Sequence, residues 1–436
     1  MKRNIPIINI ESAQGARLLA VMKDARRRQD DGAISTVEKT IADVRKNGDK
    51  ALFAYSKKFD GQSLTPATLR IGDSEISSQA AKAPLDFKTA LVEAADRIVA
   101  YHSMQKGNSF SIVTKEGRLT QMVRPLSRVG VYVPGGYASY PSSVLMDVIP
   151  AQIAGVKEIA VVTPPKSELD PKVAFALRLL KVKEAYRIGG AQAIAALAYG
   201  TKSIKAVDKI VGPGNLFVAL AKKCVYGTVD IDAVAGPSEV VILADATANP
   251  DWVALDLLAQ AEHGSGAERA LCITENKKLA ERIAGCLVDE IQKSPVRAVF
   301  EKLHPLSICV CIAKNRDASI KFINDIAPEH LQMITKTCKK DIEKILNASA
   351  VFCGPYAPVA LGDYFIGTNH VLPTGGAARF GSPLGVESFT KRMSVAEITP
   401  AGLSGCAKSV SILARSEKFV HHALSVERRA EILNNI

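Results

Sequence analysis

A segment that ends a predicted helix carries two side chains able to bind a metal ion. Residues 257–264 read LLAQAEHG, with Gln260 and His263 three residues apart. Pro250 suits the first helical position and Gly264 suits a C-terminal stop, which predicts a helix between them. Side chains three apart share a helix face, so an amide oxygen and an imidazole nitrogen can meet at one cation. A lone histidine in a last helical turn is also a common buried or dipole-complementing residue, and both interpretations stay open here.

A second segment places a carboxylic acid beside an imidazole. Residues 324–332 read NDIAPEHLQ, so that Glu329 and His330 are adjacent and follow Pro328. Adjacent residues of a helix do not face each other, and a turn or helix start at Pro328 is needed to present both to one substrate. Two acceptors with separately tunable pKa values suit two different proton transfers. An exposed surface pair is the alternative.

Two further segments contain candidate ligands. Residues 361–376 are dense in glycine and carry Asp363 and His370, a composition typical of functional loops. Near the C-terminus, Glu417 and His422 lie five residues apart on a predicted helix, where plain solvent exposure is the alternative.

The middle of the chain alternates strands with helices. The predicted strands are 129–133, 158–163, 186–188, 209–211 and 239–243, and the predicted helices are 142–154, 171–181, 191–199 and 215–224. Such a series predicts a parallel sheet covered on both faces. The first hundred residues are predicted to be mostly helical, with a capping box at 35–38.

Glycine-bearing turns join three of these strands to the next helix. They are 133–137 (VPGGY), 189–192 (GGAQ) and 212–215 (GPGN). Glycine allows close backbone approach and a helix N-terminus supplies N–H donors, which together suit a phosphate-bearing cofactor. Because no G-x-G-x-x-G is present, the turns predict a nucleotide-type site without the standard dinucleotide fingerprint, and plain tight turns are the alternative.

Composition excludes several classes of protein. A chain of 436 residues is too long for one small core, so two or more subdomains are expected. The N-terminus lacks the apolar run of a signal peptide, and no run of 18 apolar residues occurs, which predicts a cytoplasmic protein without a membrane span. The net charge of +12 is dispersed except at 26–28, without interleaved aromatic residues, which argues against a nucleic-acid partner. Eight cysteines without a CxxC pair indicate reduced, structural thiols.

Six motifs resemble, in order, those of bacterial histidinol dehydrogenases. They are GPGN at 212–215, AGPSE at 235–239, LLAQAEH at 257–263, APEHLQ at 327–332, GDY at 362–364 and GTNHVLPTGGAARF at 367–380. The resemblance covers essentially the whole chain. It implies an α/β fold of two related Rossmann-like parallel-sheet domains, one inserted in the other, with small N- and C-terminal extensions.

The resemblance also implies a division into domains. An N-terminal extension would span 1–30, and residues 31–132 and 241–384 would form a discontinuous α/β domain that carries zinc and the catalytic residues. Residues 133–240 would form the inserted NAD-binding domain. Residues 385–436 would form a C-terminal extension for dimerisation.

The activity implied by the resemblance is oxidation of L-histidinol to L-histidine through L-histidinal with two NAD, the last steps of histidine biosynthesis. His330 would accept the hydroxyl proton, and Glu329 would activate the water that hydrates the aldehyde. The implied ligands of one zinc ion per subunit are Gln260, His263, Asp363 and His422. The last would come from the partner subunit of a homodimer, together with Glu417. The implied substrate-binding residues are Ser238, Gln260, His263, His330, Asp363, Glu417 and His422, and those of the NAD site are Tyr132, Gln192 and Asn215.

Two alternatives are compatible with the same residues. A related zinc- and NAD-dependent enzyme could oxidise another polar alcohol, such as a sulfonated diol, although Glu417 argues against an anionic substrate tail. A zinc hydrolase could use the same ligands with Glu329 as its base, but it would leave the three glycine-bearing turns without a role.

Overall fold

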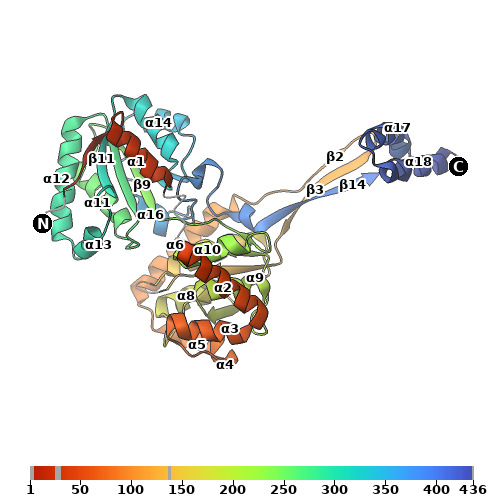
Figure 1. The fold of residues 1–436 in the computed structure, drawn as a ribbon, viewed down its shortest axis with the longest axis horizontal. Helices are drawn as coiled ribbons and strands as arrows, with labels where there is room; N and C mark the ends of the chain where they lie inside the picture. Colours follow the sequence, from red (N-terminus) through yellow and green to blue (C-terminus); the bar gives the residue numbers. More distant parts are fainter. Residues whose placement is uncertain (1–3, 25–30, 136–138, 435–436) are drawn as a thin grey trace.

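The computed structural model describes residues 4–24, 31–135 and 139–434. Two lobes, each built on a parallel sheet, lie side by side, and an arm extends away from both and ends in the C-terminal helices (Figure 1). The basic cluster at 26–28 and part of the predicted 133–137 turn fall outside the described residues. Among the described helices, none is long and apolar enough to cross a bilayer.

The first lobe contains a five-stranded parallel sheet in the order β6-β5-β4-β7-β8. Its strands are β4 (Arg128–Tyr132), β5 (Glu158–Thr163), β6 (Glu184–Arg187), β7 (Lys209–Val211) and β8 (Asp230–Ile231). The first strand lies in the middle and the order reverses there, as in doubly wound nucleotide-binding sheets. The strands predicted in this region are confirmed.

Helices cover both faces of this sheet because its strands are apolar on both sides. On one face Val129 and Val131 pack against α7 (Pro141–Ala154) and α8 (Pro171–Leu179), and on the other Val162 packs with α9 and α10. Those two helices are α9 (Gly190–Tyr199) and α10 (Leu216–Val225). The four predicted helices are therefore confirmed to within two residues at each end.

The second lobe repeats this topology in a six-stranded parallel sheet, ordered β1-β11-β10-β9-β12-β13. Its strands are β1 (Ile7–Asn9), β9 (Glu239–Ala244), β10 (Arg269–Thr274), β11 (Ile308–Ile312), β12 (His330–Ile334) and β13 (Ala350–Cys353). Its larger helices are α1 (Ala13–Asp24), α11 (Pro250–Ala261), α12 (Lys277–Lys293) and α14 (Arg316–Ile326). Its short helical segments are α13 (Arg297–Glu301), α15 (Cys338–Asp341), η2 (Ile342–Lys344), α16 (Val359–Tyr364), η3 (Ala377–Arg379) and η4 (Val386–Phe389). Two related α/β sheets are thus present, as predicted.

The residues before the first sheet are helical, as expected. They form α2 (Asp31–Asn47), α3 (Asp49–Tyr55), η1 (Ser56–Asp60), α4 (Pro66–Leu69), α5 (Asp73–Ala81) and α6 (Leu85–Ser103). The predicted capping box at 35–38 is wrong, because helix α2 already begins at Asp31 and those residues lie inside it.

The packing of these helices differs from the predicted domain division. Val37 and Val44 of α2 share a core cluster with α9 and α10, so this helix packs with the five-stranded sheet and not with residues 241–384. Strand β1 lies within the predicted N-terminal extension, yet Ile7 pairs with Val310 at the edge of the six-stranded sheet. Helical periodicity shows that one face of α2 is apolar but not which sheet that face will cover.

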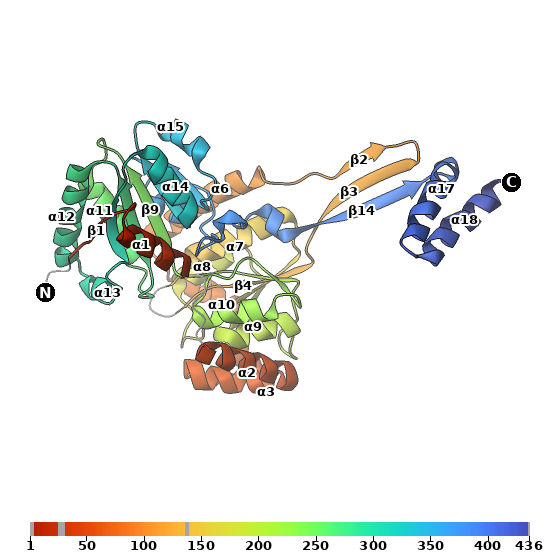
Figure 2. The same cartoon turned by 45° about the horizontal axis from the view of Figure 1, so that its top comes forward.

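The arm is a three-stranded antiparallel sheet that ends in two helices (Figure 2). Its elements are β2 (Phe110–Val113), β3 (Gly117–Pro125), β14 (Thr390–Ile398), α17 (Pro400–Ser416) and α18 (Val420–Asn434). Strand β14 pairs with β3 along its whole length, from Thr390 opposite Pro125 to Ile398 opposite Gly117. Most of the residues predicted to form a C-terminal extension are therefore carried away from both lobes.

Candidate active site

The predicted catalytic and metal-binding residues of the second lobe lie at the amino edge of its six-stranded sheet. His330 is the first residue of β12, Glu239 is the first residue of β9, and Gln260 lies at the end of α11, which runs back to this edge. The first lobe approaches here, because Asn369 donates a hydrogen bond of 2.7 Å to the carbonyl of Met146 on α7. The site therefore lies beside the contact between the two lobes.

Helix α11 starts at Pro250 as predicted but ends at Ala261, so Gln260 lies in its last turn and His263 lies in the turn that follows. Asn249 accepts a hydrogen bond from the N–H of Asp251 and caps the helix. The Nδ1 of His263 donates to the carbonyl of Gln260 at 3.0 Å, which leaves Nε2 of a neutral ring as a free acceptor. The amide of Gln260 is buried and, within the described chain, its Nε2 has no hydrogen-bond partner.

Glu329 and His330 are both held by one peptide of strand β9. The Oε2 of Glu329 accepts the N–H of Glu239 at 2.8 Å, and the Nδ1 of His330 donates to the carbonyl of the same residue at 3.2 Å. Both side chains are almost completely buried. No helix starts at Pro328; Ala327 ends α14 in a left-handed conformation and a bend at Glu329 leads into β12. The shared Glu239 peptide brings the two side chains together.

Asp363 of α16 completes this cluster. Its Oδ1 lies 3.6 Å from the Nε2 of His330, and the Nδ1 of His330 lies 3.6 Å from the Oε2 of Glu329. His263 is close enough to shift the pKa values of Glu329, Asp363 and His370. His370, to which the sequence assigned no role, donates through Nδ1 to the carbonyl of Asp363 at 2.8 Å.

Burial and neighbouring charges shift the pKa values of these three groups in opposite directions. Burial lowers the pKa of His330, but the carboxylates of Glu329 and Asp363 outweigh it and raise that pKa to about 9. Burial raises the pKa of Glu329 above its ordinary value despite the neighbouring imidazole. Burial also acts to raise the pKa of Asp363, yet its contact with His330 holds that pKa below the ordinary value. The pKa values of Glu329 and His330 are therefore raised above their ordinary values, whereas that of Asp363 is lowered.

The glycine before Asp363 is required by packing. A Cβ at Gly362 would lie 2.5 Å from the ring of Phe352, and this ring in turn lies against His330 with centroids 6.2 Å apart. The GDY motif therefore lets α16 approach β13 closely enough to bring Asp363 to the imidazole.

We expect Gly362→Ala to destabilise the protein by about 1–3 kcal/mol, because the added methyl group must displace the Phe352 ring. Thermal unfolding measures this as a lowered Tm. Gly285→Ala in helix α12 is the matched control, since a Cβ there meets no atom within 4 Å and alanine favours the helix. Equal Tm values for the two variants would refute the packing argument.

The remaining candidates for substrate contact divide into two groups. Ser238 directly precedes Glu239 and so lies next to the cluster, with its carbonyl accepting the N–H of Arg269 at 3.1 Å. Glu417 ends α17, and His422 lies on α18 with its ring 5.1 Å from that of Phe419. Both are exposed on the arm, away from the cluster of the same chain (Figure 1).

Of the four residues predicted to bind zinc, His263 and Asp363 lie close enough to act on each other electrostatically, and Gln260 lies three residues before His263, at the end of α11. Within residues 4–24, 31–135 and 139–434, no group of three or more histidine, cysteine, aspartate or glutamate side chains is arranged to hold a metal ion. The eight cysteines, all of them described, are free, which agrees with structural thiols.

The predicted cofactor residues lie at the carboxyl edge of the five-stranded sheet. The hydroxyl of Tyr132, at the end of β4, accepts the N–H of Gly190 at 3.2 Å, and burial raises the pKa of this tyrosine to about 12. The Nε2 of Gln192 donates to Asp60 at 3.2 Å. Asn215 caps α10 by accepting the N–H of Val218 at 3.1 Å. All three stand at the glycine turns that were predicted to approach a nucleotide.

A buried ion pair behind the 212–215 turn was not found from the sequence. The Nζ of Lys222 donates to the carbonyl of Gly212 at 2.9 Å and pairs with Asp232, which itself accepts the N–H of Gly212 at 2.8 Å. Gly212 has φ +109°, and a Cβ there would overlap the carbonyl oxygen of Tyr132. The ion pair thus binds both the carbonyl and the N–H of Gly212, at a position that only glycine fits.

Comparison with known proteins identifies relatives along almost the whole chain. The sequence profile of the family described as histidinol dehydrogenase matches residues 23–430. A histidinol dehydrogenase of Listeria monocytogenes is 46% identical over 399 residues, covering 91% of this chain and 93% of the relative. One from Bacillus anthracis is 45% identical over 396 residues, covering 90% and 92%. A crystal structure of histidinol dehydrogenase from Elizabethkingia anophelis superposes with a TM-score of 0.91 at 34% identity and covers 99% of both chains.

Proposed function

The chain belongs to the histidinol dehydrogenase family, and from this we propose that it oxidises L-histidinol to L-histidine through L-histidinal, reducing two NAD. The observation that carries the proposal is the family match across the chain, joined to an intact Glu329–His330 pair on the Glu239 peptide. The reaction forms the last steps of histidine biosynthesis. Because NAD and histidinol are metabolites of the cytoplasm, we also propose a cytoplasmic location.

One zinc ion per subunit is part of this proposal, with Gln260, His263, Asp363 and the partner subunit's His422 as ligands. The donor set supports it: two imidazoles, one carboxylate and one amide suit a borderline cation. Gln260 is buried at the end of α11, and the tautomer of His263 leaves its Nε2 available. When bound, zinc would mainly orient the substrate.

A homodimer with shared sites accounts for the position of the arm. Glu417 and His422 are exposed far from the cluster of their own chain, and the arm also exposes large apolar side chains. These include Phe110, Ile112, Val113, Ile398, Ile412, Leu413 and Phe419. Such an apolar surface is typical of an association site, and in a two-fold dimer each arm would reach the partner's cluster.

The residues of the cluster would divide the proton transfers between them. His330 donates through Nδ1 to the Glu239 carbonyl, and in its neutral form, which its raised pKa of about 9 makes more abundant as the pH rises, its Nε2 would accept the proton of the substrate hydroxyl. Tyr132, Gln192 and Asn215 would hold NAD, which would supply the hydride acceptor for both oxidation steps. Glu329, whose buried carboxylate has a raised pKa, would remove a proton from the water that hydrates the aldehyde. Ser238 and the partner subunit's Glu417 would contact the substrate.

NADH formation with purified protein, L-histidinol and NAD tests this function. We expect two NADH per histidinol, loss of turnover after chelation, and recovery when zinc is restored. Absence of turnover with zinc bound would refute histidinol as the substrate, and other polar alcohols would be tested next. One NADH per histidinol would instead refute the second oxidation.

A further inference from the structure

The chain passes from the second lobe to the first directly after helix α16. Val359 of α16 belongs to a buried cluster of the second lobe, whereas Leu384 belongs to the first-lobe cluster that contains helices α6 and α7. Phe365 already packs against this first-lobe cluster. Residues 365–386 therefore form a crossing segment between the lobes. Because this segment begins two residues after Asp363, its position affects where the proposed zinc ligand lies relative to the first lobe.

Two glycines let the crossing segment lie directly against the end of helix α6. Gly367 has φ +110°, and a Cβ there would lie 2.6 Å from the carbonyl oxygen of Arg97. A Cβ at Gly385 would lie 2.7 Å from the Oε1 of Gln105, just after α6. The same Oε1 accepts the N–H of Val386 at 3.1 Å. The crossing segment is therefore in contact with the first lobe near both of its ends.

Asn369 lies between these two contacts, is buried, and bonds to three groups. Its Nδ2 donates to the carbonyl of Met146 on α7 at 2.7 Å and to the Nε2 of His102 on α6 at 3.4 Å. Its Oδ1 accepts the N–H of Val371 at 2.8 Å. The Nε2 of His102 is an acceptor because Nδ1 of this neutral, buried ring donates to Gln105 at 2.7 Å. One amide thus joins the crossing segment to two helices of the first lobe.

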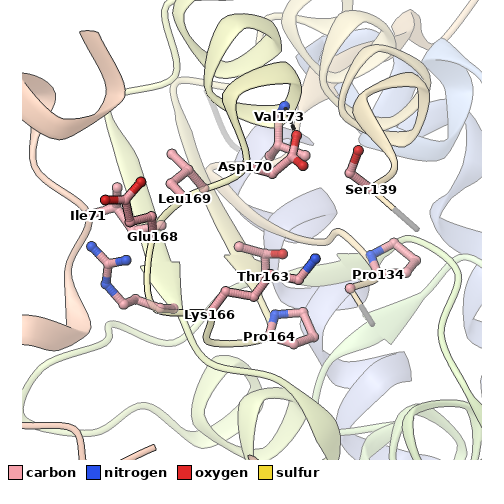
Figure 3. Close-up of a pocket in the computed structure, with 12 residues that line it drawn as sticks. Ile71, Pro134, Ser139, Thr163, Pro164, Lys166, Glu168, Leu169, Asp170 and Val173 are labelled. Carbon is pink, nitrogen blue, oxygen red and sulfur yellow. Dashed lines mark hydrogen bonds between the residues drawn. The ribbon is translucent and has the colours of Figure 1, made fainter. Parts of the chain in front are cut away.

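Helix α7 offers Asn369 a carbonyl that the helix itself cannot pair. In an α-helix the carbonyl of a residue accepts the N–H four residues later, and the residue four after Met146 is Pro150, which has no N–H. Because Met146 is completely buried, its carbonyl needs a partner from elsewhere, and Asn369 supplies it. Helix α7 packs in the first-lobe core with α8, whose start is shown in Figure 3 with Asp170 accepting the N–H of Val173 at 3.2 Å. The bond therefore reaches the packed body of the first lobe.

The next residue, His370, connects this bond to the cluster of the second lobe. Its Nδ1 donates to the carbonyl of Asp363 at 2.8 Å. The Oδ1 of Asp363 in turn lies 3.6 Å from the Nε2 of His330. A continuous set of contacts therefore runs from α6 and α7 to the acid–base cluster.

We propose that Asn369, supported by His102, is a positioning residue that sets the distance between the first lobe and the Glu329–His330 cluster, an inference that rests on the proposed dehydrogenase function. Hydride transfer requires the two reacting carbon atoms to meet about 3–3.5 Å apart. In the proposed function each lobe holds one of the two reactants. An error in the distance between the lobes therefore slows the transfer without weakening the contacts that each reactant makes within one lobe.

Asn369→Ala should lower kcat for histidinol oxidation by about 10–100-fold, because a misplacement of about 1 Å is enough for such a loss. KM for histidinol and the content of bound zinc should change by less than about threefold, since the second-lobe contacts remain. With histidinol deuterated at its reacting carbon, the primary isotope effect on kcat should exceed that of the wild type, because hydride transfer becomes slower relative to the other steps.

Two further variants separate this role from a purely structural one. In Asn369→Ser the hydroxyl still accepts the N–H of Val371 and keeps the local turn, but the shorter side chain does not reach Met146, so kcat should fall as in Asn369→Ala. In the double variant Pro150→Ala/Asn369→Ala, the added backbone N–H pairs the Met146 carbonyl within the helix and should raise Tm toward the wild-type value, but kcat should stay low. Pro150→Ala alone is the control and should keep the wild-type kcat.

Hydrogen–deuterium exchange of the zinc-loaded, NAD-free protein measures the link without turnover. Exchange within residues 365–373 and at the end of α6 should be faster in Asn369→Ala than in the wild type. Unchanged exchange, a wild-type kcat in Asn369→Ala or Asn369→Ser, or recovery of kcat together with Tm in the double variant would overturn the proposal. The exchange measurement needs no histidinol, so its outcome is independent of whether the wild type oxidises histidinol, on which the proposed function depends.

Discussion

Heterodimers that combine an Asp363→Ala subunit with a His422→Ala subunit should recover about half of the wild-type activity, although each homodimeric variant is inactive. Each variant lacks one proposed zinc ligand at both sites. In the heterodimer, one site receives both substitutions and the other receives none. The expected recovery follows because Asp363 lies in the cluster beside His330, whereas His422 lies on the arm of the same chain, away from it.

The measurement uses co-expressed subunits with two different affinity tags, purified in succession, and records both NADH formation and bound zinc. His421→Ala is the matched control, since it removes the neighbouring exposed imidazole of the same helix and should retain full activity. An inactive heterodimer would contradict a shared site. Loss of activity in His421→Ala with retention in His422→Ala would shift the ligand by one residue.

Replacing Glu329 by glutamine should lower kcat by about 10²–10⁴-fold and stop the reaction after one NADH. The amide oxygen can still accept the N–H of Glu239, so the position of the side chain is preserved. The charge that makes it a base is lost. The first oxidation depends on His330 and should persist at a reduced rate, because the imidazole loses its anionic neighbour at 3.6 Å.

Single-turnover experiments count the NADH formed per active site in this variant and identify the product by mass spectrometry. We expect one NADH and accumulated histidinal. Glu281→Gln, an exposed carboxylate of helix α12, serves as the control and should yield two NADH at the wild-type rate. Two NADH at an undiminished rate from Glu329→Gln would assign the activation of water to another group.

Individual helices and strands were predictable because the sequence patterns that indicate them lie within the element itself. Strands β4, β5, β6, β7 and β9 and the four helices α7 to α10 follow from side-chain patterns within about ten residues, and the structure confirms them. The start of α11 at Pro250 was also predictable from its capping residues. The error at 35–38 has the same origin, since a Ser-x-x-Glu pattern also occurs inside a helix.

Associations between distant segments were not predictable from such patterns. Helix α2 shows one apolar face, but only the folded chain decides that Val37 packs against α9 of the five-stranded sheet. No local pattern in the sequence predicts that Lys222 is buried, because its ion-pair partner Asp232 lies ten residues later, after the end of helix α10.

By itself the sequence determined the family and the side-chain types from which the site is proposed: Gln260, His263 and Asp363, the adjacent Glu329 and His330, and the motifs that surround them. The tertiary structure decided how these groups act on one another. The peptide of Glu239 holds Glu329 and His330 together, and the close approach allowed by Gly362 brings Asp363 to the imidazole. It also decided that His422 stands apart on an arm. The sequence specifies the type of each side chain, but which side chains meet depends on the packing of the whole chain. At this site we propose that it depends on a second chain as well.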